Sequence, residues 1–506
     1  MTGDAAAQRN ASFESGGVDA LAGWSLYRPD DPLRGVAVAV DTTVAAVGAR
    51  SLKIEQQNAA GFTRVAQRLR YAELVPASGA AAVPARRLRL RAALRAGGAA
   101  TAGLWLRVAG AKGALYLDSR GDGREGVGGA ETALDAAART AEWLREELEL
   151  PLPPDADEVA FGALLRGQGT GWFDDFSLEV IDVAARPPPT ATAARYLDDA
   201  LAVLERNSIN GLSLDWRDLR TAAGRQARGA DAPSGVYPAL RYAIYELGDR
   251  HSYLLAPRAQ AALDRAPVSN ARTGRAAVLP RAERLAGAYG YVAVPGFAGG
   301  SAQAQVEFAE QVQASIENVD LSGTCGWILD LRLNNGGNLW PMLAGVGPLL
   351  GEGEAGASLY PDGRRTSIWY RDGQAGFGDY AQLRVREPYR PAAPPPVAVL
   401  LGPGTASSAE VLAVAFRGRA GTLSFGTPTS GLSAGNRTFV LADGAALVLT
   451  VAATADRAGR VYADAIEPER PVQAAREAGA ATLDDVQVRA AADWLATQAA
   501  CRGAGN

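Results

Sequence analysis

The chain has 506 residues, of which 48% are hydrophobic and 21% charged, and its formal net charge at pH 7 is −4. This length predicts two or three domains with enough apolar surface for their cores. The small net charge and the lack of a basic block argue against a nucleic-acid partner, and no apolar run reaches the ~18 residues of a membrane span. Residues Met1–Gln8 do not have the pattern of a signal peptide.

Residues 9–183 are predicted to form an all-β domain. Short runs that alternate apolar and polar residues are separated by turns rich in Gly, Pro and Asp. Several short strands with regular turn signals are typical of a β-sandwich. The runs are 51–55, 87–94, 103–108, 159–165 and 172–180.

The two ends of this domain carry a resemblance. Asn10-Ala-Ser-Phe-Glu14, followed by Gly23-Trp24, opens it, and the run Trp172–Glu179 closes it. These motifs resemble those of the galactose-binding-like jelly rolls found in carbohydrate-binding modules. The resemblance implies a structural calcium, for which Glu14 and Asp175 are the candidate ligands. The alternative is a spacer domain with surface carboxylates at these positions.

Four tryptophans of the sandwich, Trp24, Trp105, Trp143 and Trp172, have two interpretations. Aromatic rings can stack on sugars, which would make a glycan the partner of this domain. Aromatic side chains in a sandwich also fill its core.

Residues 184–190 contain three consecutive prolines and are predicted to be a stiff linker. Residues 191–255 have apolar side chains at helical spacing. Leu197, Leu201 and Leu204 share one helix face, and Gly248 is a typical stop signal at the C-terminus of a second helix. We interpret this region as the helical N-terminal part of the next domain.

Residues 285–475 alternate strand and helix, which predicts an α/β core, and 476–506 are expected to be a C-terminal helix and tail. Predicted strands are 289–294, 326–331, 397–401, 422–425 and 446–452. Predicted helices are 301–318, 339–350 and 408–417. The segment around 352–390 is expected to be a loop region.

Few side chains of this sequence can act as a base near neutral pH. His251 is the only histidine, and the only lysines are Lys53 and Lys112. The two cysteines, Cys325 and Cys501, cannot form a disulfide framework and are expected to be unpaired small hydrophobes.

One segment places a serine between a strand and a helix. The apolar run 397–401 is followed by Gly-Pro-Gly-Thr-Ala and then by Ser407, Ser408 and Glu410. A helix N-terminus offers unpaired N–H groups and the positive end of the helix dipole, which suit a developing oxyanion. A plain serine N-cap is the structural alternative.

A second segment, Asp330-Leu-Arg332-Leu-Asn334-Asn-Gly336-Gly337, ends a buried strand in a glycine turn. Consecutive glycines allow the backbone to approach a ligand closely, so their N–H groups are candidate oxyanion donors. The alternative is an ordinary turn in which Asp330 and Arg332 pair for structural reasons.

Together these segments resemble the S41 family of serine peptidases, the tail-specific or C-terminal processing proteases. The family's Asp-Leu-Arg-x-Asn-x-Gly-Gly turn is matched by 330–337, and its serine three positions before an acid by Ser407 and Glu410. Its Gly-x-Pro-Thr-x-Gly turn is matched by 426–431. The resemblance covers about 191–475 and implies a core of the ClpP/crotonase-like kind.

The sequence departs from the best-known members, which carry a catalytic lysine just after the last of these turns. Leu432 stands there, and no lysine follows Lys112. A second branch, which resembles the tricorn core protease, takes a histidine base from the upstream helical region. His251, in the sequence Gly-Asp-x-His-Ser, is similar to that base.

The resemblance also implies an acidic residue that orients the imidazole, near the C-terminal end of the core. The matching stretch Tyr462–Glu469 offers Glu467 and Asp464. Asp249 is close to His251 in sequence, but a side chain two residues away on a turn can point elsewhere. Only 38 positions separate His251 from Tyr289, too few for the PDZ domain of many family members.

These features predict acyl transfer, with Ser407 as nucleophile, His251 as base, and N–H groups of Ser408 and of Gly336 or Gly337 around the oxyanion. Ser408 is the rival nucleophile. The substrate would be a peptide or protein, and no metal or organic cofactor is required.

Two alternatives remain beside the enzyme. One is a non-catalytic ligand-binding protein with an S41-like fold. The other is a carbohydrate-binding or adhesion protein that acts through the sandwich or binds a protein there. The family resemblance places the protein in the periplasm or outside the cell, and a cytoplasmic location is the alternative.

Overall fold

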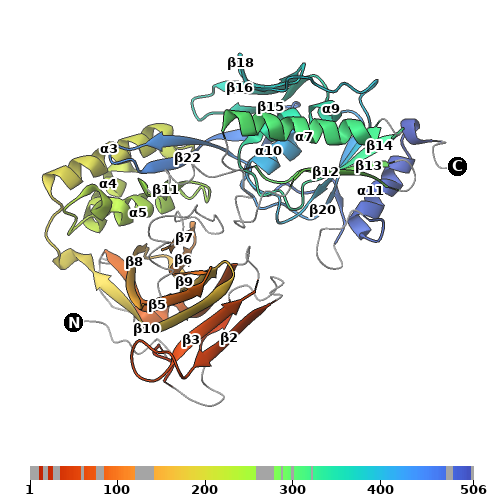
Figure 1. Cartoon of the computed structure of the whole chain (residues 1–506). Helices are drawn as coiled ribbons and strands as arrows, with labels where there is room; N and C mark the ends of the chain where they lie inside the picture. The colour runs from red at the N-terminus through yellow and green to blue at the C-terminus, as the bar shows by residue number, and fades with distance from the viewer. Residues whose placement is uncertain are drawn as a thin grey trace. The chain divides into compact units, whose positions relative to one another are not determined.

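The structure is a computed structural model in which the chain forms two compact units (Figure 1). Unit 1 comprises Met1–Leu263 and Arg437–Leu449, and unit 2 comprises Asp264–Asn436 and Thr450–Asn506. The described residues are 11–14, 21–26, 35–57, 62–75, 85–119, 142–257, 279–285, 289–297, 301–320, 323–473 and 482–502. Met1–Gln8, Asn10 and the expected boundaries at 9, 475, 476 and 506 lie outside them.

The first part of unit 1 is the predicted jelly-roll sandwich. Its strands form two five-stranded sheets, in the orders β1-β4-β9-β6-β7 and β2-β3-β10-β5-β8, and neighbouring strands are antiparallel. A short helix, α1, follows β4. The elements are β1 (Ser25–Leu26), β2 (Val36–Asp41), β3 (Ser51–Gln56), β4 (Phe62–Arg70), α1 (Tyr71–Leu74), β5 (Arg86–Gly98), β6 (Thr101–Gly110), β7 (Gly113–Asp118), β8 (Leu144–Leu152), β9 (Ala156–Arg166) and β10 (Gly169–Asp182).

Apolar side chains from both sheets fill the space between them, among them the fully buried Phe161 and Phe173. Trp24 packs among Phe13 and Phe176, with ring centroids 5.1 and 4.7 Å away. Trp105 is fully buried in a smaller cluster of the same domain. These two tryptophans therefore belong to the core, whereas Trp143 and Trp172 are only partly buried.

The two residues considered for calcium hold protein groups instead. Glu14 Oε1 accepts the N–H groups of Ala49 and Arg50 at 2.9 and 3.1 Å, and Asp175 Oδ2 lies 2.7 Å from Nη1 of Arg145. Among the described residues, no group of three acidic, histidine or cysteine side chains is arranged to hold a metal. The contacts of Glu14 and Asp175 therefore do not support a calcium site. The calcium ion implied by the resemblance stays an untested prediction.

The helical region completes unit 1. It contains η3 (Val183–Ala185), α3 (Ala191–Asn207), η4 (Gly211–Ser213), α4 (Trp216–Gln226), η5 (Pro233–Val236), α5 (Tyr237–Leu247) and β11 (Tyr253–Leu255) (Figure 1). As predicted, α5 ends at Gly248, whose φ of 68° is the left-handed C-cap that glycine adopts without strain. The proline-rich segment 184–190 is bound to the loop after α4, because Pro187 O accepts the N–H of Gly229 at 2.8 Å.

Unit 2 is built on a six-stranded sheet in the order β12-β13-β14-β19-β20-β24, parallel except for β12. Helices cover both of its faces, which explains why its central strands are apolar throughout. The strands are β12 (Arg281–Leu285), β13 (Tyr289–Ala293), β14 (Gly326–Asp330), β19 (Val397–Leu401), β20 (Thr422–Gly426) and β24 (Arg470–Pro471). The helices are α7 (Ala302–Asp320), α8 (Leu339–Gly345), α9 (Gly347–Leu350), α10 (Ser408–Ala415), α11 (Val486–Ala496) and η6 (Ala499–Cys501).

Two predictions for unit 2 were wrong. The helix expected over 339–350 is divided at Val346, before Pro348, since proline cannot donate within a continuous helix. The expected loop region 352–390 contains four antiparallel strands, whose buried side chains, such as Ile368 and Tyr370, join the main core. They are β15 (Gly353–Leu359), β16 (Arg365–Arg371), β17 (Gln374–Phe377) and β18 (Tyr380–Arg384), and the later strands are β21 (Gly435–Val440), β22 (Ala446–Ala455) and β23 (Val461–Tyr462).

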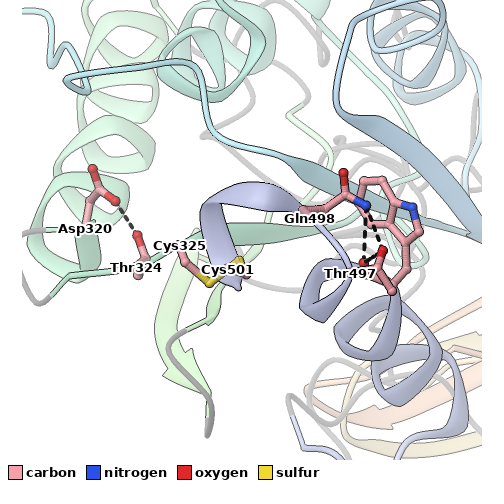
Figure 2. The surroundings of a disulfide bond; sticks show 7 residues. Asp320, Thr324, Cys325, Thr497, Gln498 and Cys501 are labelled. Atoms are coloured by element: carbon pink, nitrogen blue, oxygen red, sulfur yellow. Dashed lines mark hydrogen bonds between the residues drawn. A yellow bond between two sulfur atoms is a disulfide. The ribbon is translucent and has the colours of Figure 1, made fainter. Parts of the chain in front are cut away.

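The expectation of unpaired cysteines was also wrong, because Cys325 and Cys501 form a disulfide across 176 residues (Figure 2). Cys325 directly precedes β14, and Cys501 lies in η6, just after α11. Helix α11 packs its apolar face on the central strands, which brings the end of the chain to the start of β14. This proximity depends on the folded sheet, so the spacing of the cysteines in the sequence does not reveal it.

Replacing both cysteines with serine (Cys325→Ser, Cys501→Ser) should lower the free energy of unfolding by about 2–5 kcal/mol, because the disulfide restricts the unfolded chain. Denaturant titration followed by tryptophan fluorescence measures this. The wild-type protein in reductant is the matched control and should unfold at the midpoint of the double variant. Equal midpoints for the variant and the oxidised wild type would contradict a stabilising disulfide.

Candidate active site

Ser407 lies at the sharp turn between strand β19 and helix α10. Its backbone has φ 58° and ψ −125°, a region that residues other than glycine rarely enter and that costs on the order of 1–3 kcal/mol. Ser407 is partly exposed. A strained strand-to-helix turn of this kind presents a serine hydroxyl for attack in the nucleophile elbows of unrelated hydrolases.

Ser408 is held differently from its neighbour. It is 9% exposed, and its Oγ donates to the carbonyl of Gly337 at 2.8 Å. Its hydroxyl therefore joins the serine turn to the glycine turn. This role separates the two serines and favours Ser407 over Ser408 as the nucleophile.

Glu410 fixes the turn from inside the protein. The side chain is fully buried, and its carboxylate accepts hydrogen bonds from Ser407 N at 2.8 Å, Thr429 Oγ1 at 2.5 Å, Gly431 N at 2.9 Å and Leu432 N at 2.8 Å. Burial raises the pKa of Glu410, and these four donors act against that rise. One carboxylate thus joins the serine turn to the turn over 426–431.

The glycine turn approaches Ser407 so closely that it must be glycine. Gly336 has φ 92°, and a Cβ there would lie 2.9 Å from Ser407 Cβ and 2.6 Å from the Ala406 carbonyl oxygen. The N–H of Gly336 donates to Asn334 Oδ1 at 3.0 Å. Within the described part of the chain, the N–H of Gly337 has no such acceptor, so Gly337 is the better candidate of the two for an oxyanion donor.

The same two turns are bound to each other by their backbones. Asn334 O accepts the N–H of Ala406 at 3.1 Å, and Thr405 Oγ1 donates to Leu331 O at 2.9 Å. Gly404 lies against the Arg332 carbonyl, where a Cβ would come within 2.3 Å of the oxygen. These contacts set the position of Ser407 relative to the glycine turn.

Asp330 and Arg332 pair for structural reasons, as the alternative interpretation held. Nη2 of Arg332 lies 2.6 Å from Asp330 Oδ2, and its Nη1 contacts Asp485 at 2.5 Å and Gln487 at 2.9 Å. Tyr291 donates to the same Asp330 oxygen at 2.7 Å. The network joins the end of β14 to the start of α11 and keeps the glycine turn in place.

His251 belongs to unit 1, four residues after Leu247, the last residue of α5, and is 3% exposed. Asp249 holds the turn around it: its Oδ1 accepts the N–H groups of His251 and Ser252 at 2.9 and 2.7 Å, and its Oδ2 accepts Ser252 Oγ at 2.6 Å. Asp249 is therefore engaged with the turn backbone and Ser252. Strand β11, which follows, pairs with residues 446–448 of β22.

The hairpin tip between β21 and β22 is also fixed within unit 1. Asp443 accepts hydrogen bonds from Tyr196 of α3, at 2.6 Å, and from Tyr237 of α5. Burial and these bonds raise the pKa of both tyrosines. Burial opposes ionisation of Asp443, but the two hydroxyls lower its pKa below the ordinary value. The hairpin is thus bound to the helices that precede His251.

Glu467 and Asp464 lie in unit 2 and are exposed. Their carbonyl oxygens accept from Arg417 Nη2 at 2.5 Å and Ser433 Oγ at 3.2 Å. Between them, the N–H of Ile466 donates to Thr429 Oγ1 at 2.8 Å, and Thr429 in turn contacts Glu410. The segment with both candidate acids is therefore attached to the turn that Glu410 organises.

Comparison with known families places the core in one of them. Residues 288–472 match the model of peptidase family S41. The chain contains an S41 peptidase domain. The match covers the serine turn, the glycine turn and the acidic candidates of unit 2, and it supports peptidase activity.

Individual relatives are distant. The chain is 25% identical over 305 residues to a nisin-resistance protein of Lactococcus lactis subsp. lactis, which covers 60% of this chain and 88% of that protein. A lipoprotein structure from Streptococcus agalactiae is 21% identical and covers 60% of this chain and 96% of its own, with a TM-score of 0.47. The structure of the CBM22-1 xylan-binding domain from Paenibacillus barcinonensis Xyn10C is 16% identical. The match covers 34% of this chain and 92% of that domain, with a TM-score of 0.23.

The variant Glu410→Gln tests the role of the buried carboxylate. An amide nitrogen would replace one acceptor oxygen, and each N–H left without an acceptor costs about 1–3 kcal/mol. We expect a lower free energy of unfolding and a kcat/KM for peptides that falls at least about tenfold.

The control is Glu354→Gln, which alters a surface carboxylate that pairs with Arg365. Glu354→Gln should change the free energy of unfolding by no more than about 0.5 kcal/mol, as surface substitutions usually do. It should leave kcat/KM close to that of the wild type. If Glu410→Gln behaved like this control, Glu410 would not be what fixes the serine turn.

Proposed function

We propose that the protein is a serine peptidase in which Ser407 attacks the peptide carbonyl and His251 is the base. The observation that carries this proposal is the strained backbone of Ser407, held by Glu410 at a helix N-terminus beside a glycine turn. Strain of this kind persists only where the surroundings enforce it, and it is concentrated at functional sites.

The N–H groups of Ser408 and Gly337 are the proposed oxyanion donors. Ser408 begins α10, where the first N–H groups have no partner within the helix. Gly336 brings the glycine turn against Ser407 Cβ. As the tetrahedral intermediate forms, its negative oxygen would gain two hydrogen bonds that the planar substrate does not use fully.

His251 would take the proton of Ser407 as the tetrahedral intermediate forms and then donate it to the amine nitrogen, so that the C–N bond breaks, the amine departs and the acyl-enzyme ester remains. Water would attack that ester with the same imidazole as base. The choice of histidine follows from the sequence, because His251 is the only one and no lysine follows Lys112.

A carboxylate is needed to orient the imidazole and stabilise its cation. Asp249 accepts three hydrogen bonds from its own turn, so we keep Glu467 and Asp464 for this role. Their attachment to Thr429, and through it to Glu410, supports a position near the serine turn.

We propose an oxidising compartment, periplasmic or extracellular, for this enzyme. The Cys325–Cys501 disulfide supports it, since structural disulfides persist where thiols are not kept reduced. No helix among the described residues is long and apolar enough to cross a membrane.

A glycan is the second proposed partner, through the sandwich. Only Trp143 and Trp172 remain candidates for stacking on sugars, because Trp24 and Trp105 are buried. Trp172 donates from Nε1 to Asp41 Oδ2 at 2.9 Å, and the Arg95 guanidinium lies 5.4 Å from its ring. Trp172→Ala should abolish retention of the protein on insoluble xylan, whereas equal retention of variant and wild type would exclude this surface.

Hydrolysis of a fluorogenic peptide library tests the peptidase. Ser407→Ala and His251→Ala should each lower kcat by at least about a thousandfold, as removal of one triad member does, while Ser408→Ala should keep most of the activity. An imidazole base also predicts activity that falls below about pH 6.5. A rate that is unchanged from pH 5 to 9, or an active Ser407→Ala protein, would contradict the mechanism.

The acidic member is identified by comparing Glu467→Gln and Asp464→Asn in the same assay. The residue that orients the imidazole should lower kcat by about 10²–10⁴-fold with little change in KM, as loss of a triad carboxylate does. The other variant is the control and should be nearly wild type. If neither substitution lowers kcat, the third group lies elsewhere.

A further inference from the structure

The turn between strands β6 and β7 of the sandwich, residues 110–113, lies against the last turn of helix α5. In this sandwich turn the N–H of Lys112 donates to the Tyr245 hydroxyl at 3.4 Å. The same hydroxyl donates to Asp155 Oδ2, also of the sandwich, at 2.8 Å. Lys112 Nζ pairs with Glu246, the next residue of α5. The end of one helix is therefore held by several groups of the sandwich.

Tyr245 is part of the sandwich core, although it belongs to a helix. The residue is 5% exposed, and every other described member of its apolar cluster comes from residues 11–180. Burial and the carboxylate of Asp155 raise the pKa of Tyr245, so its hydroxyl keeps the proton at neutral pH and remains a donor. One side chain, apolar along its ring and polar at its tip, thus anchors the end of α5 in the sandwich.

Gly110 makes room for this anchor. The pairing of β6 with β9 shifts in register at Gly110, and a Cβ at this position would lie 2.3 Å from the Tyr245 hydroxyl oxygen. A glycine at such an irregularity is typical of a place where another group approaches a strand closely. The sandwich is thus shaped locally to accept Tyr245, which a domain attached only by a linker does not require.

The sandwich turn also reaches the residue directly before His251. Arg250 has a φ of 59°, a left-handed backbone conformation that is uncommon outside glycine. Its side chain lies against Gly113, where a Cβ would be 3.2 Å from Arg250 Cγ. Strain of this kind persists only where the surroundings enforce it, and the sandwich turn is one of those surroundings.

Local hydrogen bonds connect the anchor to His251. The N–H of Gly248 donates to Tyr245 O at 3.1 Å, and Asp249 accepts the N–H of His251 at 2.9 Å. We propose that the sandwich turn positions His251, with Tyr245 as the positioning residue, so that the sandwich takes part in catalysis without touching the substrate. The inference rests on the proposed role of His251 as the base. A base must lie within hydrogen-bond reach of the proton it takes, so a small displacement lowers the rate steeply.

The imidazole can be observed directly, because His251 is the only histidine of the chain. Protein labelled with ¹³C-histidine, without a histidine tag, should give one imidazole cross-peak in a ¹H–¹³C spectrum. Tyr245→Phe removes the hydroxyl and keeps the buried ring, so the protein should fold and the cross-peak should move. Tyr389→Phe is the matched control, since that hydroxyl also donates to an aspartate, Asp320, and it should leave the cross-peak in place.

Peptide hydrolysis measures the consequence for catalysis. Tyr245→Phe should lower kcat by about 10- to 100-fold, as a misplaced catalytic group does, and leave KM unchanged, because a hydroxyl in the sandwich core does not touch a peptide. Gly110→Ala presses a methyl group against the same hydroxyl and should act in the same way, and the effects of the two substitutions should not add in the double variant. Gly224→Ala is the control for the glycine change, since a Cβ there meets no atom within 4 Å.

Two results would overturn the inference: an imidazole cross-peak that stays in place in Tyr245→Phe, or a kcat equal to that of Tyr389→Phe. The peptidase proposal is judged separately, by hydrolysis in the wild type. Hydrolysis with an unmoved cross-peak rejects the role of the sandwich turn alone. A cross-peak that moves in a protein that hydrolyses no peptide rejects the peptidase and keeps the coupling between the sandwich turn and His251.

Discussion

A single buried carboxylate organises the turns around Ser407 in unit 2. Glu410 accepts the N–H of Ser407 and reaches across to Thr429, Gly431 and Leu432. The backbone conformation of Ser407 is unfavourable for a residue other than glycine, and it persists only because surrounding contacts such as this acceptor enforce it. The free energy of four hydrogen bonds inside the protein thus offsets the local strain, and it fixes the turn in which a Ser–Lys member of the family would carry its lysine.

The chain has Leu432, not a lysine, directly after the turn over 426–431. Leu432, which stands where the S41 resemblance implies a lysine in Ser–Lys peptidases, donates its backbone N–H to Glu410. This position therefore supports the buried carboxylate and carries no basic side chain. His251 is held in its own unit by the Asp249 turn and by the pairing of β11 with β22. The proposed nucleophile and the proposed base are therefore each held by local contacts of their own unit.

How far the sequence predicts this arrangement depends on the range of the contacts. Ser407, the glycine turn and the end of α5 at Gly248 were predictable, because each is a local pattern of strand, glycine and helix start. The four strands over 353–384 were missed, since they alternate weakly and gain stability by packing on the main core. The disulfide and the attachment of Asp443 to two tyrosines link positions 176 and more than 200 residues apart, which no local pattern encodes.

Active-site labelling tests the central claim, that Ser407 is a nucleophile activated by His251, most directly. The folded protein would be treated with a serine-reactive fluorophosphonate and the modified residue mapped by mass spectrometry in wild type, Ser407→Ala and His251→Ala. The account predicts a phosphonylated Ser407 in the wild type and no adduct in either variant. An adduct on Ser408, unchanged labelling in His251→Ala, or no adduct on the folded wild-type protein would contradict it.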